Sequence, residues 1–559
     1  MSIKNNKQYK DWIENVNVDE ELKNELKNMN QNEIKFAFEN KLTFGTAGIR
    51  GILGVGPGKF NIFTIRSVTR AYARLIRNKF KDCTRKIVIG HDNRHKSKEF
   101  AMEAAKILSS YDINVLLFKD NEMRPTPVVS FLTSKLQCSG GIVITASHNP
   151  KEYNGYKIYD EFGCQLVDEE TQLISEYMEK YDDILNWKYI ENNDKIKYVC
   201  EKDEDYYNNI ISDLQFFKND KKNLTVIYSA VNGTGTKYVP KFLSQSNFNV
   251  IEVKEHAYED PDFINVGNPN PEFEKAWEIP LIYAKKNKDA DIIVITDPDA
   301  DRLGVAVKHD GKWHRLNGNE TGPLLIEWRL KNLKERNLLP KNPALYSSFV
   351  TSNLGDRVAN EKYGVKIIKT LTGFKWMASE ILKEEQRDLN FVFAYEESFG
   401  YVIDKSTKDK DGIQAAMAIC EAAWYYKVKE NKTLIDKLDD LYKEFGYYYT
   451  KTINLNFKPE ELKLKIEPII EKMRNEQFGD IDGIDISFIE DYKEGLFNMP
   501  SQNLLKFYFV DNSWFAIRPS GTEPKVKIYF VCVDSSMERA KQKFKSFSDF
   551  LSKFISVKF

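Results

Sequence analysis

Gly140-Gly141-Ile142-Val143-Ile144-Thr145-Ala146-Ser147-His148-Asn149-Pro150 is the run on which the fold prediction rests. Its apolar part is short enough to be a buried strand, and Pro150 keeps the following polar loop from entering a helix directly. Ser147 therefore follows a strand end, where open α/β sheets bind their ligands, and it is a candidate nucleophile. The alternative is a strand followed by an ordinary polar turn, because Ser, His and Asn are common in turns.

Strands and helices alternate around this run. Apolar runs at 86–91, 114–118 and 140–145 accompany a helical pattern at 97–110. This alternation predicts a mostly parallel sheet with helices on its faces. It returns with strands at 224–231, 249–253 and 290–296, and once more at 344–350, 365–369 and 390–394. We therefore expect three successive α/β units of similar layout.

The C-terminal segment has a different pattern, with two helices among several closely spaced strands. This mixture predicts an α+β domain with antiparallel pairing. A chain of 559 residues is too long for one hydrophobic core. We expect domains at 1–210, 211–318, 319–445 and 446–559, with residues 1–40 forming a charged helical lead-in to the first.

The overall charge excludes some classes of partner. Lys and Arg number 82 and Asp and Glu 83, so the formal net charge of −1 favours neither nucleic acid nor an anionic membrane. The six cysteines are scattered without a CxxC pair, which fits a reducing compartment. Because the N-terminus is polar and no long apolar segment follows, we expect a soluble cytoplasmic protein.

A glycine-rich segment precedes the first strands. In Leu42-Thr43-Phe44-Gly45-Thr46-Ala47-Gly48-Ile49-Arg50-Gly51, the glycines would let backbone N–H groups approach an anion, and Arg50 suits a phosphate. The spacing is not GxGxxG and no strand is expected before it, so a dinucleotide fingerprint is excluded. A mobile glycine loop is the alternative.

The strand predicted at 290–296 delivers Asp297-Pro298-Asp299-Ala300-Asp301-Arg302. On a straight strand the three carboxylates would span about 13 Å, too far for one ion. We therefore expect the loop to curl, and three hard oxygen ligands then suit Mg²⁺. One alternative is that the aspartates point into solvent. Another is an aspartyl nucleophile of the haloacid-dehalogenase type, which would leave the serine loop unexplained.

Two further segments carry polar side chains at strand ends. Tyr395-Glu396-Glu397-Ser398 suits sugar hydroxyls, and Arg518-Pro519-Ser520-Gly521-Thr522-Glu523-Pro524-Lys525 suits a phosphate. A surface carboxylate pair and a plain hairpin turn are the respective alternatives. A turn expected at Asn154-Gly155 would fold Lys157 back toward Ser147.

TASHNP, DPDADR, the Glu-Glu-Ser segment and RPSGTEP occur here in an order that resembles the α-D-phosphohexomutase superfamily, especially its phosphoglucomutase and phosphopentomutase-like branch. The resemblance implies four domains around a central cleft, with the first three sharing an α/β topology and the last forming a more mobile lid. It also implies that Ser147 is phosphorylated and, with Asp297, Asp299 and Asp301, holds Mg²⁺. Sugar and phosphate contacts are implied for Thr372, Gly373, Glu396, Ser398, Lys410, Arg518, Ser520, Gly521 and Thr522.

The implied reaction is phosphoryl transfer between phospho-Ser147 and a hexose monophosphate, through glucose 1,6-bisphosphate. Arg50, His148, Lys157 and Arg302 are the cations expected to balance the site. Lys157 is the candidate general acid/base, although a lysine with a pKa of about 10.4 needs help to act as a base. Lys410 and Lys375 are further candidates for proton transfer.

Two departures from the family pattern bear on the substrate. Tyr395 stands where a glycine often precedes the Glu-Glu-Ser segment, and no histidine follows Ser398. Mannose is therefore less favoured than glucose, while pentose phosphates remain an alternative. A phosphatase or a non-catalytic sugar-phosphate sensor ranks lower. The expected partner is a small sugar phosphate, bound by a monomer or homodimer.

Overall fold

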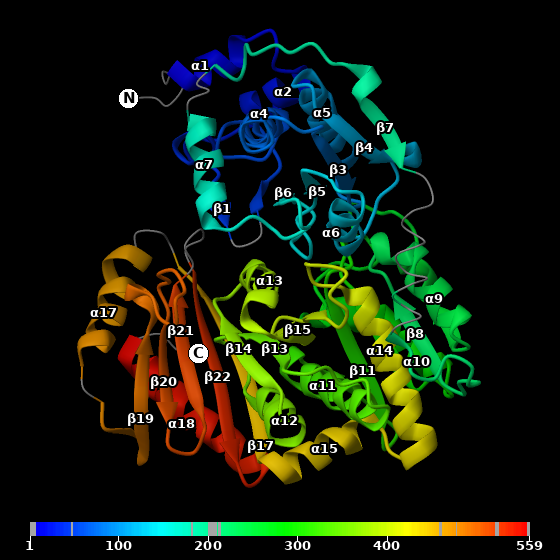
Figure 1. Ribbon diagram of the computed structural model, residues 1–559. Helices are drawn as coiled ribbons and strands as arrows, with labels where there is room; N and C mark the ends of the chain where they lie inside the picture. Colours follow the sequence, from blue (N-terminus) through cyan, green and yellow to red (C-terminus); the bar gives the residue numbers. More distant parts are fainter. Residues whose placement is uncertain are drawn as a thin grey trace.

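The structure is a computed structural model that describes residues 7–45, 48–179, 183–199, 210, 214–457, 461–476, 478–519 and 525–555. Four sheets of seven, five, four and six strands follow one another along the chain. In Figure 1 the first unit, coloured blue to cyan, lies above a row formed by the other three. The expected fold class, three α/β units followed by an α+β unit, is confirmed.

The first unit is a mixed sheet with the strand order β1-β2-β6-β5-β3-β4-β7. Its strands are β1 (Phe44–Gly45), β2 (Gly48–Ile52), β3 (Lys86–His91), β4 (Asn114–Phe118), β5 (Gly140–Ile144), β6 (Tyr153–Tyr159) and β7 (Ile196–Val199). Its helices are α1 (Lys7–Glu14), α2 (Glu20–Asn28), α3 (Gln31–Glu39), α4 (Ile62–Lys79), α5 (Ser97–Ser110), α6 (Thr126–Lys135) and α7 (Asp168–Glu179).

The central strand β5 is buried on both faces. Ile142 and Ile144 pack with helices α4 and α5 in one core cluster. Val143 points to the other face and joins α6 in a second cluster that continues into the second and third units. Successive side chains of a strand point to opposite faces of the sheet. A strand that is covered on both faces therefore needs an apolar residue at every position, which this uninterrupted run provides. The serine loop is therefore anchored by a rigid strand.

One local prediction in this unit is wrong. Asn154 and Gly155 lie inside β6, which pairs antiparallel with both β2 and β5, and not in a turn. Gly155 is required there because a Cβ would approach the Thr145 and Ile49 carbonyl oxygens to 2.5 and 2.8 Å. The two-residue strand β1 lies inside the glycine segment and pairs with β2, and no strand among the described residues precedes that segment, as expected.

The second unit has the order β12-β11-β10-β8-β9, and the third has β14-β13-β15-β16. The second contains β8 (Thr225–Ser229), α9 (Val239–Gln245), β9 (Asn249–Glu252), α10 (Glu278–Lys286), β10 (Ile292–Thr296), β11 (Leu303–His309) and β12 (Lys312–Leu316). The third contains α11 (Gly318–Glu335), β13 (Pro343–Ser348), α12 (Leu354–Tyr363), β14 (Lys366–Thr370), α13 (Phe374–Ile381), β15 (Asn390–Glu396), β16 (Gly400–Val402), α14 (Gly412–Tyr425) and α15 (Leu434–Phe445).

One four-stranded pattern recurs in all three units. Its first strand pairs in parallel with the second and the third, and the third pairs antiparallel with the fourth. The successive strands are β3-β4-β5-β6, β8-β9-β10-β11 and β13-β14-β15-β16. The loops that carry Ser147, Asp297 and Ser398 all lie between the third and fourth strand, so they occupy equivalent positions in the three units.

The fourth sheet is antiparallel throughout, in the order β17-β22-β21-β20-β19-β18. Its elements are β17 (Tyr447–Asn456), α17 (Glu467–Asn475), β18 (Asp480–Ile481), β19 (Ile484–Asp491), β20 (Leu505–Phe509), β21 (Trp514–Pro519), β22 (Lys525–Asp534) and α18 (Met537–Ile555). Figure 1 shows this orange and red unit beside the third. Among all the described helices, none has the combination of length and apolar composition needed to span a membrane.

Candidate active site

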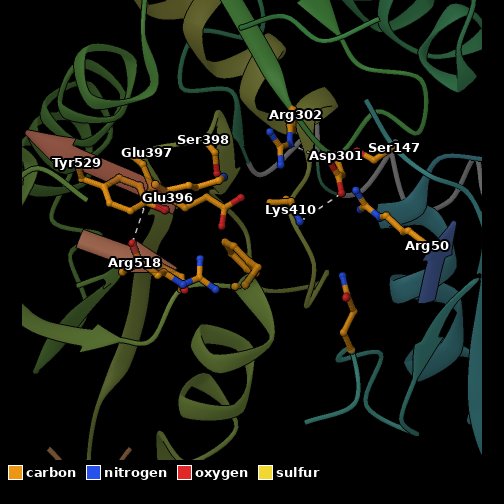
Figure 2. Close-up of a pocket in the computed structure, with 16 residues that line it drawn as sticks. Arg50, Ser147, Asp301, Arg302, Glu396, Glu397, Ser398, Lys410, Arg518 and Tyr529 are labelled. Atoms are coloured by element: carbon orange, nitrogen blue, oxygen red, sulfur yellow. Dashed lines mark hydrogen bonds and ion pairs between the residues drawn. The ribbon is translucent and has the colours of Figure 1, made fainter. Parts of the chain in front are cut away.

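The three equivalent loops meet at one cavity, which the fourth unit closes from the other side. Residues of all four units line it: Arg50, Ser147, Gln165, Asp301, Arg302, Ser348, Thr372, Gly373, Phe374, Glu396, Glu397, Ser398, Lys410, Arg518, Lys527 and Tyr529. Figure 2 shows Ser147, Asp301 and Arg50 at one end, Arg518 and Tyr529 at the other, and Lys410 between them. The cavity therefore has two polar ends.

Ser147 is held in an unusual conformation at the first end. It is 1% exposed, and its backbone φ of 51° lies in the left-handed region. That conformation costs about 1–3 kcal/mol for a residue other than glycine, so its surroundings must stabilise it. Its Oγ donates to Asp297 Oδ2 at 2.6 Å and lies 3.2 Å from His148 Nδ1. The serine is thus joined to the aspartate loop.

The aspartate loop curls as the sequence predicts. One carboxylate oxygen from each of Asp297, Asp299 and Asp301 lies within 4.8 Å of the others. The turn is made by Ala300, whose φ of 55° is left-handed and whose N–H donates to the Asp297 carbonyl at 2.9 Å. The Arg302 N–H also donates to Asp297 Oδ1 at 2.9 Å. Local hydrogen bonds therefore gather the carboxylates that a straight strand would separate.

These carboxylates could hold a metal ion. Asp299 Oδ1 and Asp301 Oδ1 are buried and have no hydrogen-bond partner within the protein. Unpaired buried carboxylate oxygens are costly, and a divalent cation would compensate them. A set of three carboxylates beside a serine hydroxyl suits a hard cation. The residues present therefore fit the metal site predicted from the sequence.

Two lysines partly neutralise the aspartates. Lys157 Nζ lies 2.7 Å from Asp299 Oδ2 and 2.8 Å from Asp301 Oδ2, and its side chain is fully buried. Lys410 Nζ lies 3.2 Å from Asp301 Oδ2 and from Asp409 Oδ1. Burial raises the pKa of Asp301 in isolation, but Lys157 and Lys410 overcome this and hold that pKa well below its ordinary value. Burial alone would lower the pKa of Lys157, but its carboxylate neighbours raise it, so this lysine carries charge.

The surroundings of His148 disfavour its cationic form. Burial and the nearby Arg302 and Arg50 lower the pKa of His148 well below its ordinary value. These surroundings favour a neutral imidazole while Ser147 is unphosphorylated, and the role of His148 in charge balance stays a prediction. The neutral imidazole can accept a proton or a hydrogen bond at Nδ1, which faces Ser147. Arg50 donates to Asn149 Oδ1 at 3.0 Å and lines the cavity, and its role toward a phosphate stays a prediction.

The two adjacent glutamates have different surroundings. Glu396 is 7% exposed, and burial raises its pKa although Lys410 and Arg302 oppose the shift. Glu397 Oε2 accepts from Ser348 Oγ at 3.1 Å and Thr351 Oγ1 at 3.0 Å within its own unit. Glu396 therefore keeps acceptor capacity for a ligand, whereas Glu397 also supports the strand ends.

Tyr395 is accommodated by two glycines. A Cβ atom added at Gly322 would come within 2.5 Å of Cδ2 of the Tyr395 ring. A Cβ atom added at Gly355 would come within 2.4 Å of the Tyr395 hydroxyl. This hydroxyl donates to the Ser352 carbonyl at 3.1 Å. The tyrosine at this position thus fills space in the core of the third unit and is fully buried. It lies behind the loop and does not line the cavity.

Basic side chains are shared by the cavity and an adjoining cleft. An adjoining cleft of about 760 Å³ shares four residues with the cavity: Arg50, Arg302, Arg518 and Lys527. All four are cations, which suits a ligand with anionic groups. Ser520, Gly521 and Thr522, predicted to hold phosphate, lie outside the described residues. Their roles stay predictions.

Sequence reasoning missed some of the lining residues. Lys527 faces Arg518 across the β21–β22 pair, and it could have been found because Lys525 and Lys527 are two residues apart on one strand. Gln165 and Tyr529 carried no motif. Lys375 forms an ion pair of 2.5 Å with Asp168 in the outer cleft and does not line the inner cavity with Ser147.

Family models match the chain in four consecutive parts. They are described as phosphoglucomutase/phosphomannomutase alpha/beta/alpha domain I (residues 41–184), domain II (204–311), domain III (317–445) and the C-terminal domain (426–543).

Curated relatives and solved structures agree with these matches. Phosphoglucomutase from Staphylococcus saprophyticus is 35% identical, with 96% of this chain and 98% of that protein covered. Phosphoglucomutase from Staphylococcus epidermidis is 36% identical, with 93% and 95% covered. The crystal structure of pp63/parafusin, a phosphoglucomutase from Paramecium in its open form, has a TM-score of 0.70 at 19% identity, covering 92% of this chain and 96% of that one. This last similarity concerns the fold.

Proposed function

Because the chain belongs to the phosphoglucomutase/phosphomannomutase family, we propose that it interconverts glucose 1-phosphate and glucose 6-phosphate through a phosphoserine at Ser147. It is an enzyme of the isomerase class that moves a phosphoryl group within its sugar substrate. The observation that carries the proposal is the shared cavity. Ser147 lines one end, and Arg518 with Lys527 lines the other.

A substrate with two reactive ends fits this arrangement. Phospho-Ser147 would transfer its phosphoryl group to the free hydroxyl of a bound hexose monophosphate. The Ser147 Oγ–P bond breaks while the sugar O–P bond forms. One proton leaves the sugar hydroxyl and one is returned to Ser147 Oγ, so the products are glucose 1,6-bisphosphate and a free serine. The bisphosphate then turns within the cavity, and its other phosphate returns to Ser147. Arg518 and Lys527 would hold whichever phosphate is not reacting.

The sugar itself would be bound by the third unit. Glu396 and Ser398 line the cavity beside Thr372, Gly373 and Lys410. A carboxylate accepts hydrogen bonds from adjacent hydroxyls, and buried polar groups of this kind discriminate strongly between sugars. These contacts would position the reacting hydroxyl at Ser147.

Proton transfer requires groups near the serine oxygen. Lys157 is charged and lies between Asp299 and Asp301, so we assign it to charge balance. In this form it can donate a proton but cannot accept one. Removing its proton would leave the aspartates less compensated. His148 is neutral and its Nδ1 lies 3.2 Å from Ser147 Oγ, which suits acceptance of a proton.

Mg²⁺ would be held by Asp297, Asp299 and Asp301 together with an oxygen of phospho-Ser147. When bound, it would supply a Lewis acid that neutralises charge on the transferring phosphoryl group. The protein holds its own part of that charge balance with Lys157, Lys410 and Arg302, whose basic groups lie around the aspartates.

The test is a coupled assay. The protein is incubated with glucose 1-phosphate, Mg²⁺ and a trace of glucose 1,6-bisphosphate, and glucose 6-phosphate is followed. We expect turnover in the wild type and a loss of at least about 10⁴-fold in Ser147→Ala, because the phosphate carrier is gone. Ser244→Ala is the control variant, because Ser244 is an exposed serine of α9 that does not line the cavity.

Other outcomes would redirect or refute the proposal. Turnover of ribose 1-phosphate or mannose 1-phosphate, but not of glucose 1-phosphate, would assign a different sugar. Release of inorganic phosphate would indicate a phosphatase, and full activity in Ser147→Ala would exclude the phosphoserine mechanism.

We also propose the domain limits 1–210, 211–318, 319–445 and 446–559, a cytoplasmic location and a monomer or homodimer. The described cysteines, Cys83, Cys138, Cys164, Cys420 and Cys532, are unpaired, which supports a reducing compartment.

A further inference from the structure

A buried arginine outside the cavity holds the serine loop. Arg94, in the loop between β3 and α5, is 3% exposed. Its guanidinium donates to backbone carbonyl oxygens along the whole loop. These are the oxygens of Ser147 at 2.6 Å, Pro150 at 2.7 Å and Tyr153 at 3.1 Å, and that of Asn149. One planar group with several donors thus connects the loop from its nucleophile to the start of β6.

Asp92 and Thr145 complete the arrangement. Asp92 Oδ2 lies 3.2 Å from Arg94 Nε and accepts from Thr145 Oγ1 at 2.6 Å. Thr145 Oγ1 in turn accepts from the Ser147 N–H at 2.8 Å. The N–H and the carbonyl of Ser147 are therefore fixed by two connected side chains. Its Oγ is left to face Asp297.

We propose that Arg94, Asp92 and Thr145 form a positioning clamp for the phosphoryl carrier, hereafter the carbonyl clamp. Its task is to hold Ser147 at its left-handed φ of 51°, a conformation that residues other than glycine rarely adopt without support. A change in this dihedral angle would swing Oγ away from Asp297. The clamp acts through Ser147, so its members are positioning residues.

The loop between β3 and α5, which carries Arg94, also contacts the second unit, which supplies the aspartates. Asn93 Nδ2 donates to the Asp260 carbonyl at 3.1 Å, and the Arg94 guanidinium lies over the Phe263 ring at 5.4 Å. Asp260 and Phe263 belong to the second unit, which also carries Asp297. The carbonyl clamp thus fixes the serine loop with reference to the aspartate loop, which explains how a 2.6 Å contact between two units is maintained.

The location of the clamp predicts a particular kinetic effect. Arg94, Asp92 and Thr145 do not line the cavity that would bind the sugar phosphate. Loss of the clamp should therefore lower kcat while leaving KM nearly unchanged, because sugar contacts persist and only the phosphoryl carrier is misplaced. This inference rests on the proposed function for its kinetic part.

Arg94→Lys is the main variant because it keeps a positive charge beside the buried Asp92. Lysine is a single point donor and cannot span the separated carbonyls. We expect kcat to fall at least tenfold, with KM within twofold of the wild type. Arg85→Lys is the matched control. Arg85 also donates to two backbone carbonyls of the first unit, those of Phe80 at 2.8 Å and Lys81 at 2.8 Å, but it lies away from the cavity.

Hydrogen exchange supplies a readout that needs no turnover. In Arg94→Lys, the amides of residues 145–153 should exchange at least tenfold faster than in the wild type, while Arg85→Lys leaves them unchanged. An inactive wild type with this exchange pattern would refute the proposed function and keep the clamp. An active wild type, with unchanged kcat and unchanged exchange in a folded Arg94→Lys, would overturn the clamp and keep the function.

A second variant covers the case in which Arg94→Lys does not fold. Thr145→Val retains the shape of the side chain and every arginine contact but removes the acceptor for the Ser147 N–H. We expect the same selective fall in kcat, and Thr145→Ser should restore it to within threefold of the wild type. Wild-type kcat in a folded Thr145→Val would overturn the clamp.

Discussion

Glu396 and Glu397 show how neighbouring residues of one type take different roles. Successive residues at the end of β15 point in different directions. Glu397 is bound by two hydroxyls of its own unit, and Glu396 is placed near Lys410 and Arg302 in the cavity. Burial raises the pKa of Glu396, so its ionised, hydrogen-bond-accepting form is lost at a higher pH than that of an ordinary glutamate.

Glu396→Gln should lower kcat/KM for glucose 1-phosphate by about 10- to 100-fold, since hydrogen bonds to a charged acceptor contribute about 1.5–3 kcal/mol. In the wild type, kcat/KM should fall as the pH drops through the raised pKa of Glu396, because the protonated acid accepts fewer hydrogen bonds. The variant should lack this acid limb. Glu397→Gln is the comparison: it should keep the limb, and a wild-type pH profile in Glu396→Gln would contradict the assignment.

The sequence was sufficient to predict residues that motifs place at strand ends and that the structure brings to one site. Ser147, the three aspartates and Glu396 are of this kind. Arg94 could not be predicted, because its partners are backbone carbonyls, which any residue can provide and which leave no spacing pattern. The sequence predicts a turn at Asn154-Gly155 that folds Lys157 back toward Ser147, and that turn does not form. The antiparallel pairing of β6 with β5 places Lys157 opposite Val143, on the strand that leads into the serine loop, and its Nζ contacts Asp299 and Asp301.

At the scale of elements, the hairpin of β21 and β22 presents two like charges side by side. Arg518 and Lys527 are directly paired across the strands. Like charges at opposed positions of an antiparallel pair repel, so the hairpin is stabilised when an anion lies between or above them. The strand positions were predictable from the apolar pattern. The pairing of these two cations required the strand register, which the apolar pattern alone does not give.

Lys527→Met should raise KM for glucose 1-phosphate by about tenfold, because a charge-assisted contact to phosphate contributes about 1.5–3 kcal/mol, while kcat changes less. The apolar stem is retained, so folding should be unaffected. Lys451→Met is the control: Lys451 is an exposed lysine on β17 of the same sheet. Steady-state kinetics at constant ionic strength measure the effect. An unchanged KM in Lys527→Met would remove Lys527 from the phosphate site.

At the scale of the whole molecule, the three repeated units place their loops at one point because each loop joins the same two strands of the same pattern. The sequence predicted the units, since their apolar runs are long and regular. It did not predict the contacts between them. Lys375 on α13 meets Asp168 at the start of α7, and Thr372 Oγ1 donates to Gln502 Oε1 at 3.2 Å, so the first, third and fourth units touch around the outer cleft.

The Asp168–Lys375 pair should help to keep the outer cleft closed on its ligand. Lys375 is 5% exposed and Asp168 is 64% exposed in their side chains, so water screens the pair and its contribution is at most about 1 kcal/mol. Lys375→Met should therefore raise KM for glucose 1-phosphate by about two- to fivefold without lowering kcat.

The charge reversal Asp168→Lys with Lys375→Asp should restore KM, whereas either reversal alone should raise it further. The difference between the wild type and Lys375→Met should also shrink between 0.05 and 0.5 M salt, about the range over which screening becomes strong. A tenfold fall in kcat in Lys375→Met, insensitive to salt and not restored by the double reversal, would show instead that Lys375 takes part in proton transfer.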